Sequence, residues 1–234
     1  MTPRADANNS RPDVPARTVL FDFDDTVVRG DAFFGFILDL LRKEPRRLPA
    51  TLVCASAVGL GVAHPKTIAP AVSALLWSAV LGLDRAALAQ RMDAFVAARV
   101  RRGGWLHAQA KLTIERHRAE GARVVVVTGC EQSLAERICQ ALALGELEIV
   151  GSQIVPYARS FIVGEHCHHT KKLACLARHG IEPPWDRVYT DSARDLPILQ
   201  HAQRATLVNP SRRTARLAHR LFGERVEVVR WTVT

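Results

Sequence analysis

Short runs of β-branched and other apolar residues alternate with helical stretches along most of this chain. We predict strands at 19–23, 123–127, 148–155, 187–190, 205–208 and 226–231, with 160–163 paired to the third as a hairpin. Helices are predicted between most of them, at 105–120, 131–144, 170–179, 196–202 and 211–222. Strands that alternate with helices form a parallel sheet covered on both faces. The sequence therefore predicts an α/β fold with a Rossmann-like parallel sheet core.

The stretch 31–102 interrupts this alternation, because it has helical patterns and no convincing strand. Leu88, Met92, Phe95 and Val96, for example, recur at helical spacing. We predict an all-helical cap inserted after the first strand, over the carboxyl ends of the strands where a lid would lie. The expected organisation is a flexible tail at 1–17, a catalytic core at 18–30 and 103–234, and a helical cap at 31–102.

Two acidic residues follow the first predicted strand. Asp22 and Asp24 are two positions apart, so in an extended segment both side chains point to the same side. Ligands of open α/β sheets bind beyond the carboxyl ends of the strands. Carboxylates this close repel each other unless a cation lies between them, and a hard cation such as Mg²⁺ takes carboxylate oxygens. The alternative is a solvated acidic turn that caps a helix.

Polar groups also follow the later segments of the predicted core. Thr128 and Gly129 end the second strand just before a helix, where a hydroxyl and free backbone N–H groups can bind an anion. Lys171 and Lys172 open a later helix, and a lysine there can neutralise a phosphate oxygen. Taken alone, Thr128 can be a helix cap, and an exposed basic pair is the commoner fate of surface lysines.

The strand predicted at 187–190 ends in acids as well. Asp191 stands at its terminus and Asp195 follows one helical turn later, so both can face the same cation as Asp22. The alternative is a helix N-cap with an acidic first turn. Polar groups suited to one metal and phosphate site thus occur in the order Asp-x-Asp, Thr-Gly, Lys, Asp-Ser-x-x-Asp.

These motifs and their order resemble the haloacid dehalogenase-like hydrolase superfamily of phosphatases, over about residues 18–210. The helical insertion after the first motif resembles the phosphoserine-phosphatase-like branch. Within this branch the chain is most similar to bacterial phosphatidylglycerophosphatases of the C type. The matching segments include Phe21-Asp-Phe-Asp-Asp-Thr, Asp31-Ala-Phe-Phe, Ser73-Ala-Leu-Leu-Trp77, Ser152-Gln-Ile and Asp191-Ser-x-x-Asp195. Asp25 and Thr190 depart from the pattern, since each replaces a frequent glycine.

The resemblance implies a chemical role for each matching residue. Asp22 would be the nucleophile that accepts the phosphoryl group, and Asp24 the general acid for the leaving alcohol and later the base for water. Thr128, Gly129 and Lys172 would bind the phosphate, with Lys171 as the less well aligned neighbour.

The resemblance also implies a magnesium site. Mg²⁺ would be bound by Asp22, by Asp24 through its backbone carbonyl, and by Asp191. Asp195 would support the metal or orient Lys172. Asp31 opens the first cap helix, either as its N-cap or as a residue that helps to select the substrate.

The composition of the chain favours an anionic partner. Its net charge of +9 suits phosphate esters, anionic lipid surfaces or nucleic acid. Five cysteines without a framework spacing indicate a reduced, intracellular setting. The apolar segments 48–63 and 68–83, flanked by basic residues, are expected to form either buried cap helices or interfacial helices on an anionic bilayer, rather than to span the membrane. We therefore expect a cytoplasmic protein that can contact the inner face of the cell membrane.

A histidine-rich segment precedes the two lysines. His166, Cys167, His168 and His169 are metal-ligating residue types, but a zinc site usually needs a second cluster at a suitable spacing. We expect this segment to be a loop beside the active site.

The sequence therefore predicts a Mg²⁺-dependent phosphomonoester hydrolase that works through an aspartyl phosphate on a lipid-linked phosphate such as phosphatidylglycerophosphate. A small soluble phosphomonoester such as phosphoserine is the alternative substrate. A non-catalytic module that binds anions or nucleic acid is an alternative of another class. It would explain the basic charge but not the ordered acids, so we expect no nucleic-acid partner.

Overall fold

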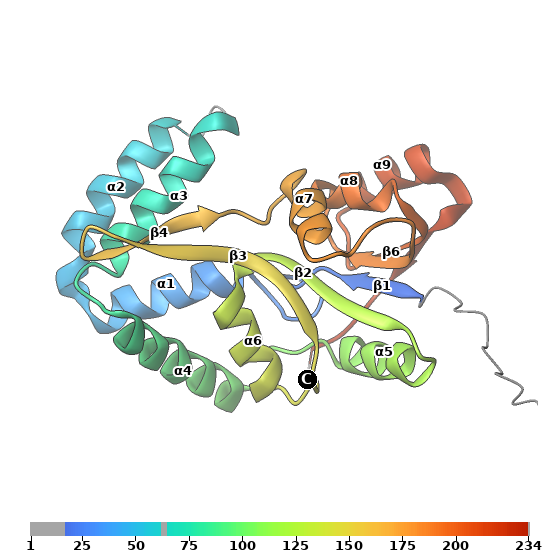
Figure 1. Ribbon diagram of the computed structural model, residues 1–234, viewed down its shortest axis with the longest axis horizontal. Coiled ribbons are helices and arrows are strands. Elements are labelled where there is room, and N and C mark those ends of the chain that lie inside the picture. Colours follow the sequence, from blue (N-terminus) through green and yellow to red (C-terminus); the bar gives the residue numbers. More distant parts are fainter. Residues whose placement is uncertain (1–16, 62–64, 234) are drawn as a thin grey trace, which may run out of the picture.

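The sheet of this protein confirms the predicted fold class. The computed structural model describes residues 17–61 and 65–233, so the predicted tail, apart from Arg17, lies outside the described residues. One seven-stranded sheet has the order β4-β3-β2-β1-β5-β6-β7 (Figure 1). The strands are β1 (Thr18–Phe21), β2 (Arg123–Glu131), β3 (Glu148–Tyr157), β4 (Ser160–Glu165), β5 (Trp185–Thr190), β6 (Ala202–Val208) and β7 (Val226–Val229). All neighbouring pairs are parallel except β3 with β4, which form the predicted antiparallel hairpin.

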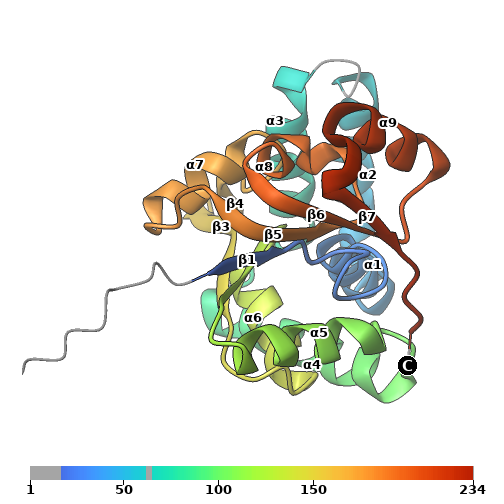
Figure 2. The same ribbon diagram turned by 90° about the vertical axis from the view of Figure 1, so that its right-hand side faces the viewer.

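Helices cover both faces of the sheet, as Figures 1 and 2 show. One face carries α5 (Ala108–Ala119) and α6 (Gln132–Ala141), and the other carries α7 (Lys171–Arg178), α8 (Leu196–Leu199) and α9 (Arg212–Phe222). Strands covered on both sides are apolar along their whole length rather than alternating. Val19, Leu20 and Phe21 of β1 are accordingly all fully buried, which makes β1 the centre of the core.

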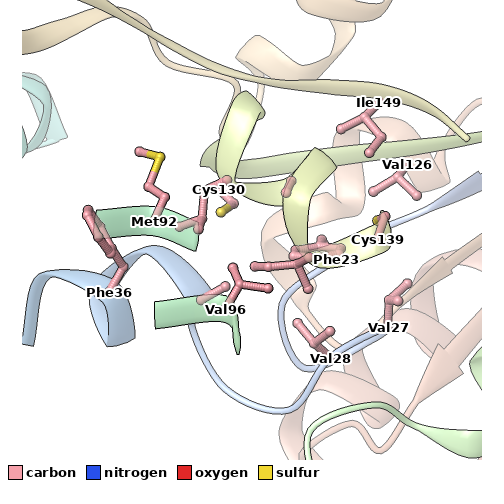
Figure 3. Close-up of a cluster of buried hydrophobic side chains, with 14 of the residues drawn as sticks. Phe23, Val27, Val28, Phe36, Met92, Val96, Val126, Cys130, Cys139 and Ile149 are labelled. Atoms are coloured by element: carbon pink, nitrogen blue, oxygen red, sulfur yellow. The ribbon is translucent and has the colours of Figure 1, made fainter. Parts of the chain in front are cut away.

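Four helices lie between β1 and β2 in the chain. They are α1 (Ala32–Lys43), α2 (Leu48–Gly61), α3 (Pro65–Ala79) and α4 (Arg85–Arg102). Figure 3 shows that Phe36 of α1 and Met92 and Val96 of α4 lie in the same apolar cluster as Phe23 and Val126. The inserted helices therefore share a hydrophobic core with one face of the sheet.

Helices α2 and α3 form an antiparallel pair that projects away from the sheet in Figure 1. At the base of the pair, α3 contacts β4: Ser160 Oγ donates a hydrogen bond to the Trp77 carbonyl at 2.7 Å. Leu52 and Val53 of α2 are exposed. Among the described residues, no helix is long and apolar enough to cross a membrane.

Several predicted boundaries differ from the structure. The first strand ends at Phe21 rather than at 23, because the chain turns after Phe23, whose carbonyl accepts a hydrogen bond from Val27 N at 2.8 Å. The helix predicted from 105 begins at Ala108, because the Trp105 carbonyl accepts a hydrogen bond from Arg29 N at 2.7 Å and extends the loop. The helix predicted at 196–202 ends at Leu199, because β6 begins at Ala202.

Candidate active site

The turn after β1 places the two acids of the first motif. Asp22 N donates to the Tyr189 carbonyl at 2.8 Å, which continues the pairing of β1 with β5 for one residue. Phe23, between the two acids, is fully buried in the apolar cluster of Figure 3. The Asp24 carboxylate accepts a hydrogen bond from Ala32 N at 2.8 Å, at the start of α1. The first motif thus joins the sheet to the inserted helices.

Asp25 is one of the two positions at which the chain departs from the pattern that it resembles. Its φ of 56° lies in the left-handed region, which aspartate tolerates better than most residues. Its Oδ1 accepts a hydrogen bond from Gly30 N at 2.7 Å, which closes the loop between β1 and α1. The side chain therefore stabilises the backbone conformation that a glycine would otherwise allow.

Lys172, the second residue of α7, contacts the first and the last motif. Its Nζ lies 2.6 Å from Asp22 Oδ1 and 2.8 Å from Asp195 Oδ1. Only 3% of Lys172 and 2% of Asp195 are exposed, so this is a desolvated ion-pair network. Burial by itself would lower the pKa of Lys172, but the carboxylates of Asp195 and Asp22 outweigh it and raise the pKa, so the lysine stays charged.

The neighbouring Lys171 is exposed and makes no such contact in the described part of the chain. The residues alone left both lysines open, and the resemblance favoured Lys172. The two side chains differ in direction because successive residues of α7 point about 100° apart. Lys172 is the one that faces the carboxyl ends of β1 and β5.

Burial also changes the acidity of the other two acids. It raises the pKa of Asp24 to about 7, and the charge of Asp31 adds to the shift. It raises the pKa of Asp191 to about 6, and the charges of Asp25 and Asp195 act in the same direction. A carboxyl with a pKa near 7 can give and take a proton at neutral pH, which is the property of a general acid and base.

The second motif lies within β2, where the register with β3 shifts between Val127 and Glu131, so the strand continues past the end predicted at 127. Thr128 is fully buried, and its Oγ1 accepts a hydrogen bond from Cys130 N at 2.9 Å. A Cβ atom on Gly129 would lie 3.2 Å from His168 Cδ2, so the imidazole packs directly on this glycine. The motif therefore lies against the histidine-rich segment that precedes α7.

Ser152, near the middle of β3, links these two segments. Its hydroxyl donates to the Gly129 carbonyl at 2.8 Å and accepts a hydrogen bond from Cys167 N at 3.0 Å. We predicted no role for Ser152 from the sequence. The sequence did contain a signal for this role, because a polar residue in a buried strand is a candidate for holding the adjoining segments by hydrogen bonds.

The histidine-rich segment is a loop in the structure, as predicted. The rings of His166 and His168 are stacked with centroids 5.3 Å apart. Burial lowers the pKa of His168 to about 4, and the charges of His166, Lys172 and Arg194 add to the effect, so the imidazole is neutral at physiological pH.

Asp31 is the N-cap of α1. Its Oδ1 accepts a hydrogen bond from Phe34 N at 2.8 Å, which satisfies one free N–H of the first turn. The capping role is thus visible, while a role in substrate selection stays a prediction.

Asp22, Asp24 and Asp191 can supply oxygen ligands for a metal ion, although their side chains do not form a cluster. Within residues 17–61 and 65–233, no three His, Cys, Asp or Glu side chains gather in a way that could hold a metal. Since the Asp24 carboxylate bonds to α1, the predicted set offers the carboxylates of Asp22 and Asp191 and the Asp24 carbonyl. Such a set fits Mg²⁺, which takes one or two carboxylates and keeps water and phosphate oxygens as its other ligands.

Comparison with known proteins agrees with this arrangement of motifs. Residues 19–200 match the haloacid dehalogenase-like hydrolase family. No curated protein sequence matches the chain. A protein of unknown function from Bordetella pertussis Tohama I superposes with a TM-score of 0.72 at 20% identity, over 92% of this chain and 98% of that one.

Two phosphoserine-phosphatase-related structures also superpose on this chain. A phosphoserine phosphohydrolase-like protein from Francisella tularensis has a TM-score of 0.60 at 15% identity, over 90% of this chain and 94% of that one. A substrate-bound phosphoserine phosphatase has a TM-score of 0.57 at 17% identity, over 86% of this chain and 90% of that one. These likenesses show a shared fold. Because the family match covers most of the sequence and includes every motif described above, this protein belongs to the haloacid dehalogenase-like hydrolases.

Proposed function

We propose that this protein is a Mg²⁺-dependent phosphomonoester phosphatase that forms an aspartyl phosphate on Asp22. The observation that carries this proposal is the buried contact of Lys172 Nζ with Asp22 at 2.6 Å and with Asp195 at 2.8 Å. In this arrangement Asp22 is the nucleophile and Lys172 is the cation that binds the phosphate. Asp24, whose pKa is raised to about 7, is the general acid.

In the first step, a carboxylate oxygen of Asp22 attacks phosphorus, and the bond from phosphorus to the leaving oxygen breaks. Asp24 gives its proton to that oxygen, so an alcohol departs and a phosphoryl group stays on Asp22. In the second step, Asp24 takes a proton from water, whose oxygen attacks phosphorus. The acyl phosphate bond breaks, inorganic phosphate leaves, and both aspartates return to their starting states.

The phosphate is bound by groups of the second motif and by Lys172. Because Thr128 Oγ1 accepts a hydrogen bond from Cys130 N, its own hydroxyl proton is available for a phosphate oxygen. Gly129 N–H is a further donor, and the absence of a side chain lets His168 pack against this residue. Stabilising the phosphoryl charge in this way supplies most of the catalysis in phosphoryl transfer.

A magnesium ion held by Asp22, Asp191 and the Asp24 carbonyl would supply positive charge beside the phosphate. Burial raises the pKa of Asp22, Lys172 opposes this change, and Asp195 and Asp191 reinforce it. A cation at this place favours the ionised form of Asp22, and only that form is a nucleophile.

For the substrate, we propose a lipid-linked phosphate such as phosphatidylglycerophosphate, with α1 to α4 as a cap that contacts the membrane. Leu52 and Val53 of α2 are 64% and 71% exposed. Lys43 and Arg46 lie just before this helix in the chain and suit an anionic bilayer. A small soluble phosphomonoester is the second candidate, since the phosphoserine phosphatase named above has the same fold.

The deciding experiment is a phosphatase assay of the purified full-length protein with and without Mg²⁺. The panel contains p-nitrophenyl phosphate, phosphoserine and phosphatidylglycerophosphate in detergent. We expect Mg²⁺-dependent phosphate release that Asp22→Asn lowers by more than about 10³-fold. Activity of Asp22→Asn at half the wild-type rate would contradict the nucleophile assignment, and release from the soluble esters alone would remove the lipid substrate. Salt-sensitive binding of DNA or RNA without phosphatase activity would favour the non-catalytic alternative.

A further inference from the structure

We infer that Thr190 is a positioning residue that holds Lys172 in place through Asp195. Thr190 is the last residue of β5 and comes directly before Asp191. The inference rests on the proposed function, because it assumes that Lys172 acts on the phosphate.

The hydrogen bonds of the Thr190 hydroxyl have a defined direction. Thr190 is fully buried, and its Oγ1 lies 2.8 Å from Asp195 Oδ2. The same oxygen accepts a hydrogen bond from Ser192 N at 3.1 Å. A backbone N–H can only donate, so the single hydroxyl proton is available to the carboxylate. Thr190 therefore connects the backbone of the turn after β5 to Asp195.

Asp195, held by Thr190, in turn fixes the position of Lys172. Lys172 Nζ lies 2.8 Å from Asp195 Oδ1 and 3.0 Å from Oδ2, so it meets both oxygens of the carboxylate. Rotation of that carboxylate is restrained, because Oδ2 also accepts the bond from Thr190. The same Nζ lies 2.6 Å from Asp22. A residue without a side-chain hydroxyl could not make this connection at position 190, so the hydroxyl supports Asp195.

The catalytic consequence follows from geometry. Small misplacements of a group that binds the transition state reduce the rate strongly. Without the Thr190 hydroxyl, Asp195 keeps its contact with Lys172 but can turn about its side-chain torsions. Lys172 then spends less time in the position that neutralises the transferring phosphoryl group, so kcat should fall more than the affinity for substrate.

The test compares Thr190→Val, Thr190→Ser and a matched control with p-nitrophenyl phosphate in Mg²⁺. Thr190→Val keeps the shape and removes the hydroxyl, and we expect kcat to fall about tenfold with a smaller change in KM. Thr190→Ser restores the hydroxyl and should stay within about twofold of wild type. The control is Thr206→Val on β6, which removes another buried hydroxyl, one that accepts a hydrogen bond from Arg187 at 2.9 Å. It should leave kcat unchanged.

A double-mutant cycle separates positioning from a general structural effect. In an Asp195→Ala background, Thr190→Val should have little further effect on kcat, because the group through which it acts is gone. Equal losses from Thr190→Val and Thr206→Val, no rescue by Thr190→Ser, or full additivity with Asp195→Ala would each overturn the inference. Asp22→Asn is measured in the same assay. Retained activity of Asp22→Asn would show that the proposed function is wrong, and this result is distinct from a failure of the inference about Thr190.

Discussion

Lys172 Nζ lies 2.6 Å from Asp22 Oδ1, although 150 residues separate the two in the chain. Both side chains are buried, so the negative charge of Asp22 depends on Lys172 for its compensation. The charge of Lys172 is compensated by Asp22 together with Asp195. The contact joins the carboxyl end of the central strand to the start of α7. The structure and the proposed chemistry of the site therefore depend on the same ion pair.

Lys172→Met should abolish most of the activity. The variant removes the cation between two buried carboxylates, so we expect kcat to fall by about 10²- to 10³-fold. Unpaired buried charge also costs stability, and the free energy of unfolding in urea should fall by about 3 kcal/mol. Lys171→Met is the matched control, because that side chain is exposed, and it should change neither quantity appreciably. A wild-type rate in Lys172→Met would exclude the lysine from the reaction.

Asp24→Asn should affect esters according to their leaving group. Loss of the general acid slows release of an alkyl alcohol much more than release of p-nitrophenolate, which needs no proton. For wild type, the first step with an alkyl ester should slow as the pH rises above about 7, where Asp24 loses its proton. Single-turnover rates between pH 5 and 9 measure this. Equal effects of the substitution on both ester types would contradict the assignment.

The same pKa predicts how stability depends on pH. Burial raises the pKa of Asp24 to about 7 in the folded protein, so between about 4 and 7 the folded state holds a proton that the unfolded state has lost. The contribution of this residue therefore falls as the pH rises through that range. Urea unfolding in EDTA should show a smaller decrease for Asp24→Asn than for wild type. Identical pH profiles for the two proteins would disprove this.

Gly129→Ala should weaken phosphate binding through His168. The new Cβ would lie 3.2 Å from His168 Cδ2, so the imidazole must move by a few tenths of an ångström. We expect a several-fold higher inhibition constant for inorganic phosphate. His168→Ala in the same chain makes room for the methyl group, so the double variant should bind phosphate better than Gly129→Ala alone. If both variants bind equally, the steric explanation is wrong.

The exposed side chains of α2 allow a direct test of the proposed membrane contact. The double variant Leu52→Asp and Val53→Asp should reduce cosedimentation with vesicles that contain phosphatidylglycerol, because two apolar groups are replaced by charges that anionic lipid repels. Leu112→Asp on α5 is the control, since that residue is 65% exposed but belongs to another helix. Equal binding of all three proteins, or binding by none of them, would argue against the contact.

Local patterns in the sequence were sufficient to predict the fold class. Buried strands need continuous apolar runs such as 124–127, and the acids and hydroxyls that follow them stand out against this background. The insertion of helices between the first two strands was also readable, since its residues repeat at helical spacing. The order of motifs then predicted the family to which the chain belongs.

Other features depend on contacts between distant segments. Three contacts at the site join separate elements. They are the ion pair of Lys172 with Asp22, the hydrogen bond from Thr190 to Asp195, and the hydrogen bonds of Ser152 with Gly129 and Cys167. Helix α5 also begins later than predicted, because the Trp105 carbonyl accepts a hydrogen bond from Arg29 N in the loop after β1. The amino-acid sequence determined which chemical groups are present and the periodicity of each element. Which groups meet was decided by tertiary packing, because the direction of a side chain depends on helix rotation and strand register that short-range patterns do not specify.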